Sequence, residues 1–116
     1  MEKTEVFKKG IRLLKRSIKE KWEPIVAGTG VDRGASNCPL CQEFLKKGCE
    51  GCPILIETGA RECEKTPFRE WNKHHKEVHD LPISAPFRVM CPTCKKLAQN
   101  VLGFGERLYK KLTLTT

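Results

Sequence analysis

The chain has 116 residues, of which 39% are hydrophobic, 31% are charged and only 7% are aromatic, and its net charge is +8. This length suits one compact domain and leaves little room for a second independent core. The modest apolar content argues against a large self-sufficient core, so a cross-link such as a bound metal ion would help to complete the fold.

The basic excess is concentrated at the two ends of the chain. Residues 1–22 carry eight basic and three acidic side chains, residues 91–116 carry five and one, and residues 23–90 have a balance of −1. Basic ends can attract phosphate backbones, and they can equally be the solvated faces of helices. No stretch has the apolar length of a membrane span, and the first ten residues show no uninterrupted apolar stretch and no small-residue cleavage site, so we predict a cytoplasmic protein with reduced thiols.

The first part of the chain predicts an amphipathic helix. Its apolar side chains recur every three or four residues from Phe7 to Trp22, which is the period of one helical face, and Pro24 is expected to stop it. Most of the lysines lie off that face. We therefore predict a basic amphipathic helix within residues 1–26 that packs on its own domain.

Seven cysteines mark residues 38–94 as a metal-binding centre. They are Cys38, Cys41, Cys49, Cys52, Cys63, Cys91 and Cys94. Six of them form pairs separated by two residues, and the tight turn within such a pair aims both sulfurs at one cation. An odd number of cysteines in a reducing compartment suits metal ligation better than disulfides. Metal binding is therefore the primary prediction.

The cysteines can be divided between two closed zinc sites in two ways. One division builds a four-thiolate site from Cys38, Cys41, Cys91 and Cys94. It leaves three cysteines that need a histidine, for which His75 and His79 are favoured because residues at i and i+4 share a helical face, while His74 stays open. The other division closes one site with Cys38, Cys41, Cys49 and Cys52. The spacing does not decide between them.

Zinc, as one or two ions, is the preferred cofactor, and iron is the rival. Paired Cys-Pro-x-Cys knuckles also hold mononuclear iron, and four thiolates can hold an iron–sulfur cluster. The sequence shows neither an open coordination position nor an activated nucleophile. We therefore expect binding rather than catalysis.

Further helices are predicted in the centre and at the end of the chain. Thr66-Pro67 provides a start and Leu81-Pro82 a stop, which predicts a helix at about residues 67–80. A short helical turn is expected at residues 42–47, and residues 53–56 are expected to form a small strand or an extended run. The apolar spacing after Cys94 predicts a basic helix over residues 95–112 that bends or breaks near its two glycines, Gly103 and Gly105.

Residues 38–71 also resemble a known pattern. The order Cys-x-Leu-Cys, Cys-x-Gly-Cys-Pro-Ile and Cys-x-x-Thr-Pro-Phe-x-x-Trp is similar to that of small cysteine-rich proteins of unknown function encoded by phages, archaeal viruses and related mobile elements. The resemblance implies metal ligation by the five cysteines of this stretch and, for a viral protein, residence in the cytoplasm of the host cell. It implies no activity.

Together these features predict a single α-rich domain over residues 1–116, in which helices flank an irregular zinc-knuckle centre. The working hypothesis is a zinc-stabilised module that binds nucleic acid through its basic terminal helices. The phosphate contacts are assigned to Lys8, Lys9, Lys15, Arg16, Lys95, Lys96, Lys110 and Lys111. The alternatives are a zinc-stabilised protein–protein adaptor or homodimer, and an iron-bearing redox protein.

Overall fold

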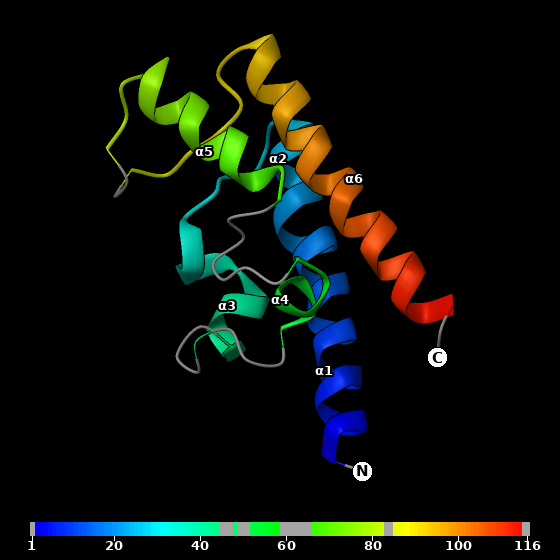
Figure 1. Cartoon of the computed structure of the whole chain (residues 1–116). Helices are drawn as coiled ribbons and strands as arrows, with labels where there is room; N and C mark the ends of the chain where they lie inside the picture. The colour runs from blue at the N-terminus through cyan, green and yellow to red at the C-terminus, as the bar shows by residue number, and fades with distance from the viewer. Residues whose placement is uncertain (1, 45–47, 49–51, 59–65, 83–84, 115–116) are drawn as a thin grey trace.

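The computed structural model describes residues 2–44, 48, 52–58, 66–82 and 85–114. Across these residues the chain is built from helices and forms no strand, so the predicted α-rich fold class is confirmed (Figure 1). The described residues contain one isolated antiparallel β-bridge, between Asp32 and Phe87. None of the helices in the described ranges combines the length and the apolar character needed to cross a bilayer.

The N-terminal helix is longer than predicted because Pro24 does not end it. Helix α1 (Glu2–Arg16) continues into a π-helical turn (Ser17–Trp22) and then into α2 (Glu23–Ala27). Pro24 takes a first-turn position of α2, where its missing N–H is tolerated. The run ends at Gly28, whose φ of 86° favours glycine, and the Thr29 N–H closes the end on the Pro24 carbonyl at 2.9 Å.

Three short helices form the centre of the chain. They are α3 (Pro39–Phe44), α4 (Pro53–Thr58) and α5 (Phe68–Glu77). Helix α3 begins earlier than the turn predicted at residues 42–47, of which 45–47 lie outside the described residues. The prediction of a strand or extended run at residues 53–56 is wrong, because Pro53 supplies the fixed φ of a helix start and the segment has no neighbouring strand among the described residues.

The last helix, α6 (Pro92–Leu114), runs without the break expected at its glycines. Gly105 is buried against the π-helical turn, and a Cβ built there would lie 3.2 Å from Ile18 Cγ1. The glycine thus allows a close approach between two helices. The contacts made by this face stabilise the helix where propensity alone would weaken it.

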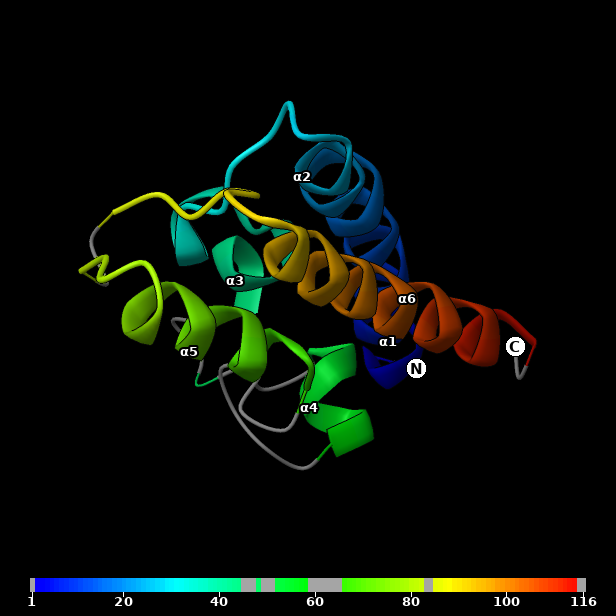
Figure 2. The same cartoon turned by 90° about the horizontal axis from the view of Figure 1, so that it is seen from above.

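Helix α6 lies along α1 and α2, and α5 packs beside its first half (Figures 1 and 2). Two clusters of buried side chains fill the space between these elements. The first contains Leu14, Ile18, Leu40, Phe44, Cys52 and Leu108. The second contains Trp22, Ile25, Trp71, Phe87, Cys94, Ala98 and Val101. Because Cys94 belongs to the second cluster, the site described next rests directly on the core.

Candidate metal centre

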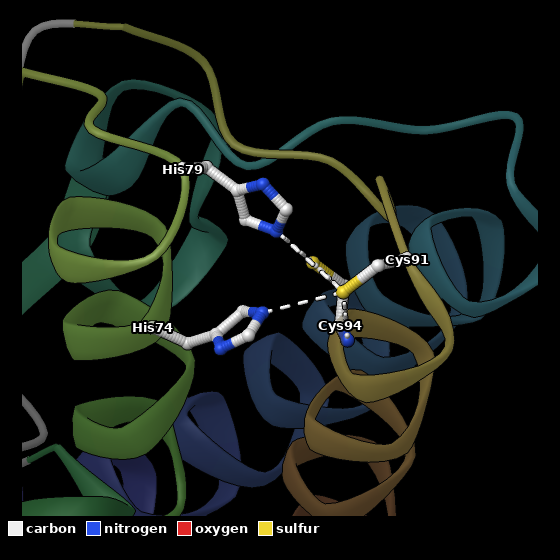
Figure 3. Close-up of side chains that lie close together, drawn as sticks. All are labelled: His74, His79, Cys91 and Cys94. Atoms are coloured by element: carbon white, nitrogen blue, oxygen red, sulfur yellow. Dashed lines mark hydrogen bonds between the residues drawn. The ribbon is translucent and has the colours of Figure 1, made fainter.

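Four potential metal ligands meet where α5 ends and α6 begins. They are His74, His79, Cys91 and Cys94, and their ligand atoms all lie within 4.8 Å of one another (Figure 3). Cys94 Sγ lies 3.2 Å from His79 Nε2, and the two sulfurs are 3.6 Å apart. Cys91 Sγ lies 3.4 Å from His74 Nε2 and 3.5 Å from His79 Nε2.

These distances match the edges of a tetrahedron around one ion. Zn–S bonds of about 2.3 Å and Zn–N bonds of about 2.0 Å place two sulfurs about 3.8 Å apart and a sulfur and a nitrogen about 3.5 Å apart. The observed sulfur–nitrogen separations are 3.2, 3.4 and 3.5 Å. The four side chains therefore form a His2Cys2 group that could hold a metal ion.

His74 and His79 lie five residues apart at the end of α5. In a continuous α-helix such residues point about 140° apart. Here the helix ends at Glu77, and the ring centroids of His74 and His79 lie 4.9 Å apart. After His79 the chain reverses at Asp80, which adopts a left-handed conformation with φ 53°, and the Leu81 N–H binds the His75 carbonyl at 3.1 Å. This turn fixes the backbone that follows His79.

The two cysteines belong to a knuckle at the start of α6. Cys91 precedes Pro92, and its carbonyl accepts the Lys95 N–H at 3.2 Å while its sulfur accepts the Cys94 N–H at 3.4 Å. This backbone N–H is the main cause that lowers the pKa of Cys91. Burial, by contrast, raises the pKa of the Cys94 thiol. A metal ion therefore meets one sulfur whose thiolate form the backbone favours and another whose thiolate form burial disfavours.

The environment of His74 also suits ligation. Loss of water around the ring, followed by the charges of His79 and His75, lowers the pKa of His74. A lower pKa favours the neutral imidazole, which is the form that offers a lone pair to a metal. Sequence reasoning left this histidine open without choosing it. The feature that could have identified His74 is the end of the helix at Glu77. Beyond that end, residues four apart need not share a face, so the pairing of His75 with His79 is no longer implied.

His75 was favoured as a ligand, and the structure places it differently. Its side chain is fully buried, Nδ1 lies 2.8 Å from the Trp71 carbonyl oxygen and Nε2 lies 2.7 Å from the Arg88 carbonyl oxygen. A carbonyl oxygen accepts hydrogen bonds and never donates them. A nitrogen that donates to such an oxygen offers a hydrogen and not a lone pair, and the four ligand atoms that lie together do not include one from His75.

The structure groups Cys91 and Cys94 with two histidines rather than with Cys38 and Cys41. The first pair nevertheless has the same local structure, because the Gln42 N–H binds the Cys38 carbonyl at 2.9 Å, as Lys95 does at Cys91. The Cys41 thiol, Lys21 and nearby backbone N–H groups lower the pKa of Cys38 to about 6 against the effect of burial. Cys52 is buried in the first core cluster, which Cys38 also contacts. The two remaining cysteines, Cys49 and Cys63, lie outside the described residues.

A buried polar network supports the site from the N-terminal side. The Lys21 ammonium lies 2.9 Å from Asp32 Oδ1, and Trp71 Nε1 donates to Asp32 Oδ2 at 2.9 Å. The backbone of Asp32 pairs in both directions with that of Phe87, at 2.7 and 2.9 Å. The network thus ties the π-helical turn to α5 and to the segment that leads to Cys91.

The basic residues predicted to contact phosphates are all exposed on α1 and α6, which pack side by side. They are Lys8, Lys9, Lys15, Arg16, Lys95, Lys96, Lys110 and Lys111. Three of them form ion pairs with glutamates: Lys9 with Glu43 at 2.8 Å, Arg16 with Glu20 at 3.1 Å and Lys111 with Glu57 at 3.1 Å. For the other five the described part of the chain shows no ion pair.

Comparisons of the chain with protein-family models, curated proteins and solved structures found no match. The class of protein is therefore defined by the fold and the site. It is a small helical domain whose His2Cys2 group can hold a metal ion between two helices.

Proposed function

We propose that the protein is a zinc-stabilised structural module in which one ion joins the end of α5 to the start of α6. The observation that carries this proposal is the set of donor atoms, two sulfurs and two imidazole nitrogens within 4.8 Å of one another. Zinc prefers four such ligands in structural sites. With four protein ligands, no position is left for a substrate or an activated water, so the role is structural rather than catalytic.

The geometry favours zinc over iron. Mononuclear iron in paired knuckles and most iron–sulfur clusters take four thiolates, whereas this group has two. A two-iron cluster with histidines on one iron and cysteines on the other would hold its nitrogens and sulfurs farther apart than one ion does. Here a sulfur and a nitrogen approach to 3.2 Å.

Elemental analysis of the purified full chain tests the proposal. We expect at least one zinc per chain and no iron. Replacement by Co²⁺ should give the visible absorption of a tetrahedral site with two sulfur and two nitrogen ligands, because the spectrum reports the donor set directly. A chain that is folded and metal-free, or one that carries iron, would overturn the proposal.

A second ion at the Cys38 knuckle extends the same proposal. The support is the backbone hydrogen bond shared with the Cys91 knuckle and the thiolate-stabilising surroundings of Cys38. We expect a ratio of two zinc ions per chain. Cys38→Ser should remove one of them and His79→Ala the other, so the two variants separate the sites. If the wild type bound one zinc ion per chain and Cys38→Ser still bound one, the second ion would be excluded.

Nucleic-acid binding is the second candidate function, and the exposed cations of α1 and α6 favour it. Each lysine that neutralises a phosphate releases condensed counterions, so affinity should fall with salt by about 0.9 log units per tenfold increase for each contact. Anisotropy titrations with a mixed-sequence RNA strand and a DNA duplex measure this slope. Undetectable binding at low salt would remove the hypothesis.

The ion pairs provide a matched control for that titration. Lys95→Gln with Lys96→Gln removes two charges for which the described residues offer no acidic partner. Lys9→Gln with Lys111→Gln removes two that already pair with glutamates. We expect the first double variant to reduce the slope by about two contacts and the second by clearly less. Equal effects would indicate diffuse charge attraction rather than a defined surface.

A further inference from the structure

His75 is a buried imidazole beside the metal centre. It is not one of the four proposed ligands, so metal ligation does not explain its presence. Its exposed fraction is 0%, so water cannot satisfy its nitrogens. The ring stacks on Phe87 with centroids 4.7 Å apart and an interplanar angle of 13°, and its centroid lies 4.2 Å from that of Trp71. Phenylalanine could fill this space as well. The two nitrogens must therefore explain why a histidine is present.

Both nitrogens contact backbone that delivers the ligands. Nδ1 lies 2.8 Å from the Trp71 carbonyl, one turn back on the helix that carries His74. Nε2 lies 2.7 Å from the Arg88 carbonyl, in the segment that enters the Cys91 knuckle. A neutral ring donates to one of these oxygens and an imidazolium donates to both. The ring ties α5 to the incoming segment when Nε2 carries a hydrogen, as it does in the imidazolium and in the Nε2–H tautomer, because that nitrogen then donates to the Arg88 carbonyl.

The same ring reaches a ligand atom. Nε2 lies 3.6 Å from Cys94 Sγ, farther than from the Arg88 oxygen but within contact of the sulfur. The segment on its other side is also fixed, because Phe87 is paired to Asp32, whose carboxylate binds Trp71. His75 therefore lies where α5, the segment before Cys91 and the knuckle itself meet.

We infer that His75 is the positioning residue of the metal centre: it holds the Arg88 carbonyl against α5 and the Cys94 sulfur beside His79, so that the four ligands are gathered before the ion arrives. This inference rests on the proposed metal site. Groups that orient metal ligands without binding the metal usually change its affinity by about 10–100-fold. His75 should do the same without contributing a donor.

Zinc competition against a chromophoric chelator, together with Co²⁺ spectra, tests this role in the full chain. His75→Phe keeps the aromatic packing and removes both nitrogens, and we expect zinc binding to weaken about 10–100-fold while the spectrum still shows two sulfur and two nitrogen ligands. His75→Gln retains an N–H donor and should recover part of the affinity. It also serves if the phenylalanine variant does not fold.

Leu108→Ala is the matched control, because Leu108 is buried in the first core cluster and not in the second, to which Cys94 belongs. It should lower the thermal midpoint and leave the zinc affinity of the His2Cys2 site unchanged. Wild-type affinity in both His75 variants would overturn the inference and show that the ring only fills space. Loss of a nitrogen ligand from the cobalt spectrum would overturn it by making His75 a ligand. A wild-type chain that binds no metal would instead defeat the proposed function itself.

Discussion

Cys94 is the most deeply buried ligand, with an exposed fraction of 0%, and it lies closest to a histidine nitrogen. Replacing its sulfur by the weaker donor of Cys94→Ser should cost about a quarter of the roughly 10–16 kcal/mol that structural zinc binding provides, or about 3 kcal/mol. Competition titration measures the loss. The control is Met90→Ser. Met90 is an exposed neighbour of Cys91 that provides no preferred zinc donor, so this variant should bind zinc as the wild type does. Equal zinc affinity of Cys94→Ser and Met90→Ser would contradict the assignment of Cys94 as a ligand.

The buried ion pair between Lys21 and Asp32 gives a second test on a single side chain. Their side chains are 4% and 2% exposed, so Asp32→Asn leaves an ammonium in the core without its counter-charge. We expect a loss of about 3–5 kcal/mol in the free energy of unfolding, measured by urea denaturation.

The control for this variant is Glu23→Gln, which breaks the exposed pair with Lys19. A surface pair contributes less than about 1 kcal/mol, so this change should be small. If both variants unfolded at the same urea concentration, the network around Asp32 would not support the fold as described.

At the scale of the helices, Gly103 in α6 and Gly30 in the loop after α2 should respond in opposite ways to replacement by alanine. A Cβ at Gly103 would lie 3.1 Å from the end of the flexible Arg107 side chain, which can move. Gly103→Ala should therefore stabilise the helix by up to about 1 kcal/mol. A Cβ at Gly30 would lie 2.7 Å from Pro24 Cβ and 3.0 Å from the Ile25 nitrogen, so Gly30→Ala should lower the thermal midpoint. The reverse order would contradict the packing.

Short-range sequence patterns predicted the three longest helices, α1, α5 and α6. The features that they missed depend on contacts between residues far apart in the chain. The three- to four-residue apolar spacing of α1 and the proline start of α5 are properties of neighbouring residues, so they are visible in the sequence. The passage of the helix through Pro24 depends on the π-helical turn, and the continuity of α6 depends on Gly105 meeting Ile18. Neither contact can be read from residues adjacent in the chain.

The metal centre shows the same limit. The spacing of Cys91 and Cys94 predicts a half-site, because a knuckle is local. The histidines beside it come from another helix, and the structure groups His74 and His79 with the knuckle while His75 faces the carbonyl oxygens of Trp71 and Arg88. Helical periodicity paired His75 with His79, because it assumed that the helix continues to His79.

For the whole molecule, the metal centre closes one end of the second core cluster. Removing zinc with a strong chelator should release the turn after α5 and the knuckle first, because the ion is proposed to join these two segments. We expect a lower thermal midpoint and reduced protection of backbone amides in residues 74–81 and 91–95 by hydrogen exchange. Re-addition of zinc should restore both. Unchanged exchange in these segments would show that the ion is not needed to close the fold.

Acid should release the metal, and the pKa shifts give the sign. The lowered pKa of Cys91 keeps its thiolate available below the range of an ordinary cysteine, whereas the raised pKa of Cys94 means that zinc must displace a proton near neutral pH. The lowered pKa of His74 keeps the ring neutral in the folded chain after an unfolded histidine, near pH 6.5, has begun to protonate. Its stabilising contribution is therefore present above about pH 6.5 and is lost as the pH falls through the folded value.

Zinc affinity measured from pH 8 to pH 5 should therefore fall with a slope that steepens on acidification. Near neutral pH binding should release protons from the cysteine thiols, that of Cys94 included, and below about pH 6 the imidazoles add to the competition. Calorimetry in buffers of different ionisation enthalpy counts the protons. Cys94→Ser should release fewer near pH 7.5 than the wild type, since the hydroxyl does not titrate. An affinity that stays constant over this range would mean that thiolates and imidazoles do not hold the ion.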